Sequence, residues 1–202
     1  NNVVDDTENG IVVEKVHGKN FGSGVVSGGF ATVSNNYVTD SSVDGISVLR
    51  SKGAVVSNNE VYGTGRDGIS VKRSDEVAVL ANDITEAGRD GVFVKLSDDI
   101  LIQQNTIFGG NGGLFTTGAT GAGRDGIHVV ESNNAVVDDN TVTGGNGGLL
   151  GAGGIGAVRN GIFVKDSAEA VISNNDVVRG SNGILAEGGD AAGANGIVAL
   201  NS

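Results

Sequence analysis

The sequence has no cysteine, proline, methionine or tryptophan, and it has only six phenylalanines and two tyrosines in 202 residues. Without cysteine the chain can form no disulfides and has no thiol chemistry. So few large apolar side chains do not suffice for the core of an ordinary globular domain of this length. No apolar run is long enough to span a membrane as a helix. Methionine is missing even at position 1, so we expect a processed product or a fragment that has lost any secretion signal.

Positive charge is also scarce, because 13 Lys and Arg stand against 24 Asp and Glu and give a formal net charge of -11. Such a chain repels phosphate backbones and anionic lipid, so we expect no nucleic-acid partner. The lack of a long apolar run predicts no membrane span. The same charge favours solubility and the binding of cations. Together with 36 glycines, this acidic, sulfur-free composition indicates an extracellular or cell-surface protein that is processed after secretion.

One short motif, Asp or Asn followed by Gly and then Ile or Val, recurs along the whole chain. Its glycines are Gly10, Gly45, Gly68, Gly91, Gly126, Gly161 and Gly196, which are separated by 23 or 35 residues. Counted from this glycine, positions +1 and +3 are apolar in every repeat, and +9, +11 and +16 are apolar in the complete repeats. This alternation predicts short strands joined by tight turns. One repeat cannot bury its own apolar face, so the repeats must stack coil on coil.

Small polar residues hold fixed positions between these predicted strands. Serine recurs at +6, and asparagine recurs at +14 as Asn59, Asn82, Asn105, Asn140 and Asn175. Asn36 takes this place in the first repeat when its twelve extra residues are allowed for. In a stack of coils each of these side chains meets its equivalent one strand spacing away and can bond to it. We therefore interpret the asparagines as structural ladders and not as a binding site.

The repeat DGISVLRSKGAVVSNNEVYGTG, residues 44–65, resembles the right-handed parallel β-helix repeat of the pectate-lyase-like superfamily. The resemblance extends over nearly all of the chain. It implies an all-β, single-stranded right-handed parallel β-helix, with about six coils of 23 or 35 residues in one domain, 1–202. It leaves activity open, because the superfamily includes polysaccharide lyases, hydrolases, mannuronan epimerases, phage tailspikes and noncatalytic surface modules.

Twelve extra residues lengthen each of the later repeats, within Gly-rich segments at about 109–123, 144–158 and 179–193. Each keeps an apolar pair in the same register, and the pairs are Leu114 and Phe115, Leu149 and Leu150, and Ile184 and Leu185. A shared register predicts that the insertions stack as a lobe with its own strand. This lobe either adds to the core or forms a lateral surface for a partner, and Phe93, His128 and Phe163 at position +2 are expected to lie under it.

Acidic residues also fall into columns when the repeats are aligned. Asp75 and Glu76 align with Asp98 and Asp99, so four carboxylates gather in one turn of two coils, where Ca²⁺ could relieve their repulsion. No cofactor is required by the sequence, and Ca²⁺ at these four residues is the one metal it suggests. The Arg-Asp pairs that end at Asp67, Asp90 and Asp125 are interpreted as surface charge pairs.

Two hypotheses for function follow, and neither assigns a catalytic residue. The favoured one is a structural or adhesive subunit that assembles head to tail with copies of itself through uncapped terminal coils, which generates a filament. Its longitudinal interface is predicted at Val3, Val4, Ile197, Val198 and Leu200. The alternative is a carbohydrate-binding or polysaccharide-active β-helix, lyase-like or epimerase-like, that meets an extracellular polysaccharide near Asp138, Asp139 and the Gly-rich lobe. Enzymatic activity is left open, with a noncatalytic role favoured.

Overall fold

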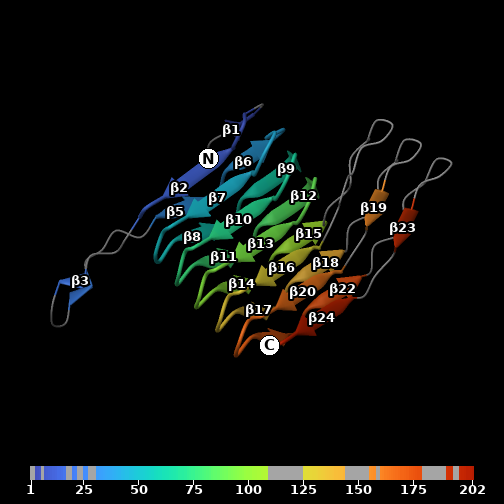
Figure 1. Cartoon of the computed structure of the whole chain (residues 1–202). Helices are drawn as coiled ribbons and strands as arrows, with labels where there is room; N and C mark the ends of the chain where they lie inside the picture. The colour runs from blue at the N-terminus through green and yellow to red at the C-terminus, as the bar shows by residue number, and fades with distance from the viewer. Residues whose placement is uncertain are drawn as a thin grey trace.

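The computed structural model is a β-solenoid whose successive coils stack along one axis, with β2 and β24 at opposite ends (Figure 1). It describes residues 3–5, 7–16, 20–21, 25–26, 31–108, 125–143, 155–157, 160–178, 190–192 and 196–202. Within these residues every element is a strand and no helix occurs, so nothing in the described part is a helix that could cross a membrane. The all-β, right-handed parallel β-helix predicted from the repeat is confirmed.

Three parallel sheets form the faces of the coil, and each repeat contributes one strand to each sheet. Sheet I begins one residue after the repeat glycine and has seven strands: β2 (Ile11–Glu14), β7 (Ile46–Leu49), β10 (Ile69–Lys72), β13 (Val92–Lys95), β16 (Ile127–Val130), β20 (Ile162–Lys165) and β24 (Ile197–Leu200). Sheet II has six strands: β5 (Thr32–Ser34), β8 (Val55–Ser57), β11 (Ala78–Leu80), β14 (Leu101–Gln103), β17 (Val136–Asp138) and β21 (Val171–Ser173). Sheet III has seven: β1 (Val3–Val4), β6 (Tyr37–Thr39), β9 (Glu60–Thr64), β12 (Asp83–Ala87), β15 (Thr106–Phe108), β18 (Thr141–Thr143) and β22 (Asp176–Val178).

The pairing register places equivalent repeat positions side by side. Ile46 pairs with Ile69, and Ile69 pairs with Val92, so the apolar position +1 forms one continuous column in sheet I. Positions +3, +11 and +16 form similar columns, and all of them point into the coil. The resulting core consists of Val, Ile and Ala, because β-branched side chains stack well on a pleated surface at one strand spacing.

The repeat glycine is required by a close approach between coils. A Cβ atom on Gly126 would overlap the side chain of Val142 and would lie 2.7 Å from the carbonyl oxygen of Gly161 in the next coil. At Gly196, in the last described coil, the nearest atom to such a Cβ is Val177 Cγ1 at 3.9 Å. Close packing therefore prevents substitution of the interior repeat glycines, but it does not prevent substitution of Gly196.

Two corners of each coil are made by residues in the left-handed conformation that come directly before the ladder residues. Arg73 has φ 51° before Ser74, and Ala81 has φ 50° before Asn82. The bend turns the chain inward, and the ladder side chain then bonds to the neighbouring coil. Ser74 N–H donates to Ser97 Oγ at 3.0 Å, and Asn82 N–H donates to Asn105 Oδ1 at 2.9 Å.

Four further strands lie outside the three sheets. β19 (Ile155–Ala157) and β23 (Asp190–Ala192) pair in parallel, and Figure 1 shows them side by side away from the coil. They come from the second and third insertions, at the same offset in each. β3 (Asn20–Phe21) and β4 (Val25–Val26) form an antiparallel pair in the first repeat. The apolar pairs predicted for the lobe, at 114–115, 149–150 and 184–185, lie outside the described residues.

Candidate functional site

A column of carboxylates is buried at the bend formed by the repeat glycines. Its members are the residues that precede those glycines, and they are defined here as the acidic column: Asp44, Asp67, Asp90 and Asp125. Asp67, Asp90 and Asp125 are fully buried, with 0% exposure. The interpretation of the Arg-Asp pairs as surface charge pairs is therefore wrong. The bend at the glycine turns these aspartates against the neighbouring coils, where backbone N–H groups hold them: Asp125 N–H donates to Asp90 Oδ1 at 3.0 Å.

Cations balance the first part of the acidic column. Arg89 donates two hydrogen bonds to Asp67, one from Nε to Oδ1 at 2.7 Å and one from a terminal guanidinium nitrogen to Oδ2. Lys72 Nζ lies 3.6 Å from Asp44 Oδ2 and 3.8 Å from Asp67 Oδ2. Burial still raises the pKa of Asp67 to about 6, assisted by the charges of Asp90 and Asp44 and opposed by Arg89. Arg89 and Lys72 therefore balance only part of the negative charge of the acidic column.

Aromatic rings form a second column on the outer side of sheet I, three residues after the acidic column. His128 lies between Phe93 and Phe163, with ring centroids 5.3 and 5.0 Å away and interplanar angles of 85° and 80°. These are edge-to-face contacts, which hold the imidazole in one orientation. The ring is nearly fully buried, as a packed histidine would be. Arg89 and Lys72 lie over the face of Phe93, at 4.8 and 5.2 Å from the centroid.

The two columns meet where His128 Nδ1 faces two carboxylates. Nδ1 lies 3.1 Å from Asp125 Oδ2 and 3.6 Å from Asp90 Oδ2, yet neither contact forms a hydrogen bond. Burial lowers the pKa of His128, but the two carboxylates raise it by more, so the net direction is upward. Among the residues that the structure describes, this is the one group of three or more His, Cys, Asp or Glu side chains whose ligand atoms converge closely enough for a metal ion.

The aligned repeats contain the residues of this cluster in two columns, but the sequence alone did not predict that the columns meet. Aspartate before the glycine and a ring at +2 were both visible as columns. Period-2 alternation, however, predicts only which face of a single strand a residue lies on. The glycine bend separates Asp125 from the strand that contains His128. Residues three apart across that bend come together, which an alternation argument does not predict.

The four carboxylates predicted as a Ca²⁺ site lie in a different turn and bond mainly to other groups. Asp75 Oδ1 accepts the Asp98 N–H at 3.1 Å, and Glu76 pairs with Lys52 at 2.7 Å. Asp98 Oδ1 accepts the N–H of Asn133 at 2.7 Å, while Asp99 Oδ1 accepts from the side chain of Asn134 at 3.0 Å. The turn therefore satisfies its carboxylates with donors from neighbouring coils, and Ca²⁺ binding there stays a prediction.

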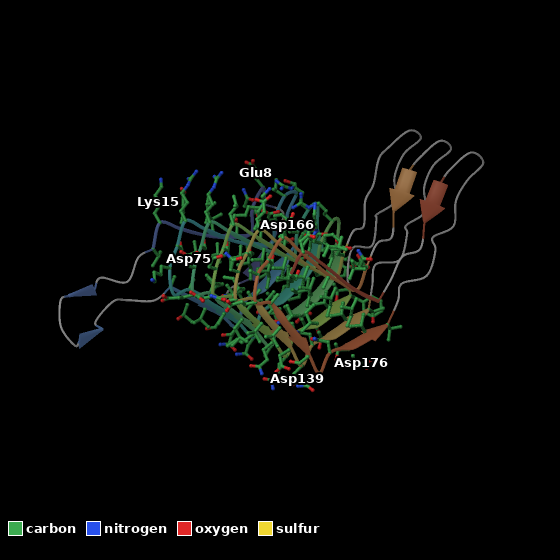
Figure 2. All side chains as sticks on the ribbon, turned by 60° about the horizontal axis from the view of Figure 1, so that its bottom comes forward. Glu8, Lys15, Asp75, Asp139, Asp166 and Asp176 are labelled. Carbon is green, nitrogen blue, oxygen red and sulfur yellow. The ribbon has the colours of Figure 1, made fainter. Side chains whose placement is uncertain are left out.

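Asp138 and Asp139, proposed from the sequence as a carbohydrate contact, lie at the end of β17. Asp138 accepts hydrogen bonds from Ser173 at 2.7 Å, Asn174 at 2.9 Å and Gln103 at 3.1 Å. These bonds, that of Ser173 first, lower the pKa of Asp138 below its ordinary value. Asp139 is exposed and directed away from the interior, as Figure 2 shows. Asp138 is thus held in place by hydrogen bonds at the end of β17, beside the exposed Asp139.

The outer side of sheet III presents exposed aromatic rings beside carboxylates, and we define it as the aromatic-acidic face. Tyr37, Tyr62 and Phe108 are 38%, 38% and 43% exposed. Tyr37 pairs in register with Glu60, which pairs with Asp83, and both acids are exposed. Large exposed rings in a chain with so few aromatics are the features of this surface that sequence alternation alone did not identify.

The Glu86 carboxylate raises the pKa of the Tyr62 hydroxyl, first as its hydrogen-bond partner and then through its charge. Tyr62 and Phe108 occupy one column of sheet III with Thr85 between them. The face therefore combines flat apolar surfaces with hydrogen-bond acceptors on rigid strands.

Apolar residues predicted at the longitudinal interface lie on edge strands. Val3 on β1 is 75% exposed, and Ile197 and Leu200 on β24 are 47% and 46% exposed. Val4 and Val198 are partly buried. These strands are at the two ends of sheets III and I, so their outer edges have no partner strand among the described residues.

The comparisons agree with this architecture. The family model described as right handed beta helix region matches residues 1–201. Full-length tailspike protein 2 from Escherichia coli O157:H7 bacteriophage CAB120 is similar in structure, with a TM-score of 0.50 and 12% sequence identity over 96% of this chain and 32% of that one. The enzymatically active domain of tailspike protein 2 from bacteriophage CBA120 has a TM-score of 0.43 and 11% identity over 98% of this chain and 36% of that one.

The chain thus spans about a third of the length of these tailspike chains. At 12% identity the likeness to the full-length tailspike shows the fold alone. A comparison with curated protein sequences gives no significant match.

Proposed function

Because the chain belongs to the right-handed beta helix family, we propose that it is an extracellular polysaccharide-binding β-helix whose contact surface is the aromatic-acidic face of sheet III. The observation that carries this proposal is the set of exposed rings of Tyr37, Tyr62 and Phe108 beside exposed carboxylates on one rigid sheet. Glycan sites need such a combination, because flat rings cover the C–H faces of sugars while polar groups fix their hydroxyls. The full-length tailspike has the same fold and belongs to a phage, which is consistent with an extracellular location for this chain.

The spacing of the rings suits an extended chain of sugars. Tyr62 and Phe108 stand in one column on β9 and β15, with β12 between them, so their backbones are about 9.6 Å apart at two strand spacings. This is comparable with the length of two linked hexose units. Tyr37 lies on β6, in the adjacent column. The three rings therefore follow the solenoid axis, along which a linear polysaccharide could lie.

Charge narrows the class of polysaccharide to neutral or amino sugars. Glu60, Asp83 and Asp176 are exposed on this face, and Figure 2 shows Asp176 on the outside of the coil. The whole chain carries a net charge of -11. A polyuronate would be repelled by these carboxylates, whereas sugar hydroxyls and amines would donate hydrogen bonds to them.

The test is the retention of the purified chain on polysaccharides of different charge. Chitin, chitosan, cellulose and soluble glucan would be compared with alginate and pectate by affinity electrophoresis and sedimentation. We expect binding to at least one neutral or amino polysaccharide and none to the polyuronates. The double variant Tyr62→Ala/Phe108→Ala should weaken binding about tenfold or more, because two ring contacts of about 1 kcal/mol each are lost.

Leu96→Ala is the matched control, since Leu96 is as exposed as Phe108, at 43%, but lies at a corner beyond sheet I. It should leave binding unchanged. Equal binding by the double variant and the control, or binding to polyuronates alone, would contradict the proposed face. Release of reducing or unsaturated ends would be measured in the same samples, because it would show that the β-helix is polysaccharide-active as well.

End-to-end assembly is the second candidate, favoured by the exposure of Val3, Ile197 and Leu200 on the edge strands. Unpaired parallel edges with apolar side chains can accept another strand. Two copies stacked along the axis would extend the same sheets and form an open, heterologous contact. The partner in this case is the chain itself.

Negative-stain electron microscopy across a range of concentrations tests this candidate. Unbranched fibres should form, and Ile197→Asp should stop their growth while the circular dichroism of the coil is retained. Asp replaces a half-exposed side chain, so folding itself should survive. Monodisperse short particles at every concentration would refute assembly and would leave the edges to be covered by other chain segments or by another protein.

A further inference from the structure

Three buried polar atoms, Asp90 Oδ2, Asp125 Oδ2 and His128 Nδ1, converge without a hydrogen bond between them. Ligand atoms of these three side chains all lie within 4.8 Å of one another. Each of the three polar atoms is inaccessible to solvent and has no hydrogen-bond partner. A buried polar atom without a partner costs about 1–3 kcal/mol, so three in one place call for a shared partner.

The other carboxylate oxygens of Asp90 and Asp125 accept hydrogen bonds, which hold these two side chains in position. Asp90 Oδ1 accepts the Asp125 N–H at 3.0 Å, and Asp125 Oδ1 accepts from the N–H and the side-chain amide of Asn160 at 2.8 and 3.0 Å. The imidazole of His128 is clamped by the rings on either side, as described above. Hydrogen bonds of this kind, from a second layer of residues, orient ligands for metal binding.

We propose that Asp90, Asp125 and His128 bind one divalent transition-metal ion, for which Zn²⁺ is the probe, and that this ion joins the coils of Gly91 and Gly126. The separations of 3.1 and 3.6 Å between Nδ1 and the two oxygens match ligands about 2.0–2.2 Å from a common centre. One imidazole with two carboxylates suits zinc and its neighbours. Ca²⁺ fits less well, because it takes six to eight oxygen ligands and does not favour nitrogen.

The nearby Arg89 side chain lowers the affinity of the cluster for a metal ion, but it does not occupy the site. Arg89 Nε lies 3.4 Å from Asp90 Oδ2, but its hydrogen bond goes to Asp67 Oδ1 at 2.7 Å. Arg124, next to Asp125 in the sequence, lies outside the described residues. Asp125 therefore has His128 as its ion-pair partner among the described side chains. The excess of carboxylates at this end of the acidic column favours a divalent ion.

Metal binding is tested on the whole chain after removal of metal with a chelator. Zn²⁺ would be added both to the folded protein and during refolding from urea, because the site is buried. Calorimetry and metal analysis should give one Zn²⁺ per chain, and the melting temperature should rise by about 5 °C or more at a hundredfold excess over Kd. Nitrogen shifts of the His128 imidazole in NMR spectra should change on Zn²⁺ addition, which reports ligation directly.

His128→Phe is the decisive variant, because a third phenylalanine continues the stack of Phe93 and Phe163 while removing the nitrogen ligand. It should fold and lose the zinc-dependent rise in melting temperature. Asp125→Asn should weaken binding at least tenfold. Asp98→Asn, in the other acidic turn, should bind Zn²⁺ as the natural chain does.

Three outcomes would overturn the proposal. One is no stoichiometric zinc under either condition, with an imidazolium spectrum for His128, which would mean that a proton fills the cluster. Another is an equal zinc response in His128→Phe. The third is loss of zinc in Asp98→Asn alone, which would place the metal in the turn at Asp98. None of these results bears on polysaccharide binding.

Discussion

Replacement of Asn105 by alanine should show how much the asparagine ladder stabilises the fold. The side chain is 1% exposed, and its Oδ1 accepts the Asn82 N–H at 2.9 Å and the Asn82 amide at 3.0 Å. Its Nδ2 donates to Val79 O at 2.9 Å and to Asn140 Oδ1 at 3.0 Å. The truncation leaves the buried Asn82 N–H without its acceptor, at about 2 kcal/mol, and removes at least two further bonds of about 1 kcal/mol each. We expect a loss of about 4 kcal/mol.

Urea unfolding followed by circular dichroism measures this loss as a change in midpoint at constant slope. Gln104→Ala is the matched control, because the neighbouring Gln104 is exposed and its amide donates one hydrogen bond among the described residues, to Asp139 at 3.1 Å. The control should stay within about 0.5 kcal/mol of the natural chain. If Asn105→Ala lost less than about 1 kcal/mol with an unchanged slope, the ladder would be a consequence of stacking and not a source of stability.

Asn105→Asp adds a pH test of the same reasoning. An aspartate keeps an acceptor for the Asn82 N–H, but it places a second acceptor against Val79 O and Asn140 Oδ1, where the amide donated. Burial and these acceptors should raise its pKa in the folded state, so the folded chain binds the proton more tightly than the unfolded chain does. The variant should therefore be most stable below pH 4 and lose stability as pH rises through that raised pKa. A pH-independent loss would refute this account.

The remaining predictions concern the glycine bend and the aromatic-acidic face. Gly126→Ala should lose about 1–3 kcal/mol and several degrees in melting temperature through overlap with the adjacent coil. Gly196→Ala should change neither, because a Cβ there meets Val177 Cγ1 at an ordinary contact distance of 3.9 Å; calorimetric scans of both variants check this. Glu86→Gln should lower the pKa of Tyr62, because the carboxylate's hydrogen bond and charge raise it, and the ultraviolet absorbance of tyrosinate in a Tyr37→Phe background measures that shift; an unchanged pKa would disprove the contact.

Much of the fold could be predicted from the sequence, because a solenoid repeats one set of contacts. Val71 and Ile69 were assigned to the core from alternation alone, and both are fully buried. The same alternation gave no information on outward positions, whose burial depends on what covers them. Ser70 and Phe93 share position +2, on the outer face of sheet I, and both are nevertheless buried.

The candidate sites were harder to predict for two physical reasons. The glycine bend brings Asp125 beside His128 through a change of direction that a periodic pattern does not contain. The contact between Tyr62 and Glu86 depends on side chains of adjacent coils, so it requires both the register and the conformation at the corner. Glu86 has φ 57°, a left-handed conformation that the sequence did not indicate at a glutamate.

The polar columns of the coil differ in how far they can extend. An asparagine both donates and accepts, so Asn82 bonds to Asn105 and Asn105 to Asn140, and the ladder could continue with every added coil. A carboxylate only accepts, and each further one at a strand spacing of about 4.8 Å adds like-charge repulsion.

The acidic column therefore needs cations along its length and a different residue at its end. Arg89 meets Asp67, and His128 meets Asp90 and Asp125. At the next coil Asn160 replaces the aspartate and donates its amide to Asp125 Oδ1 at 3.0 Å. The column thus ends where an amide replaces a carboxylate, and Asp90 Oδ2, Asp125 Oδ2 and His128 Nδ1, which form no hydrogen bond, mark the step where the described residues leave its charge incompletely neutralised.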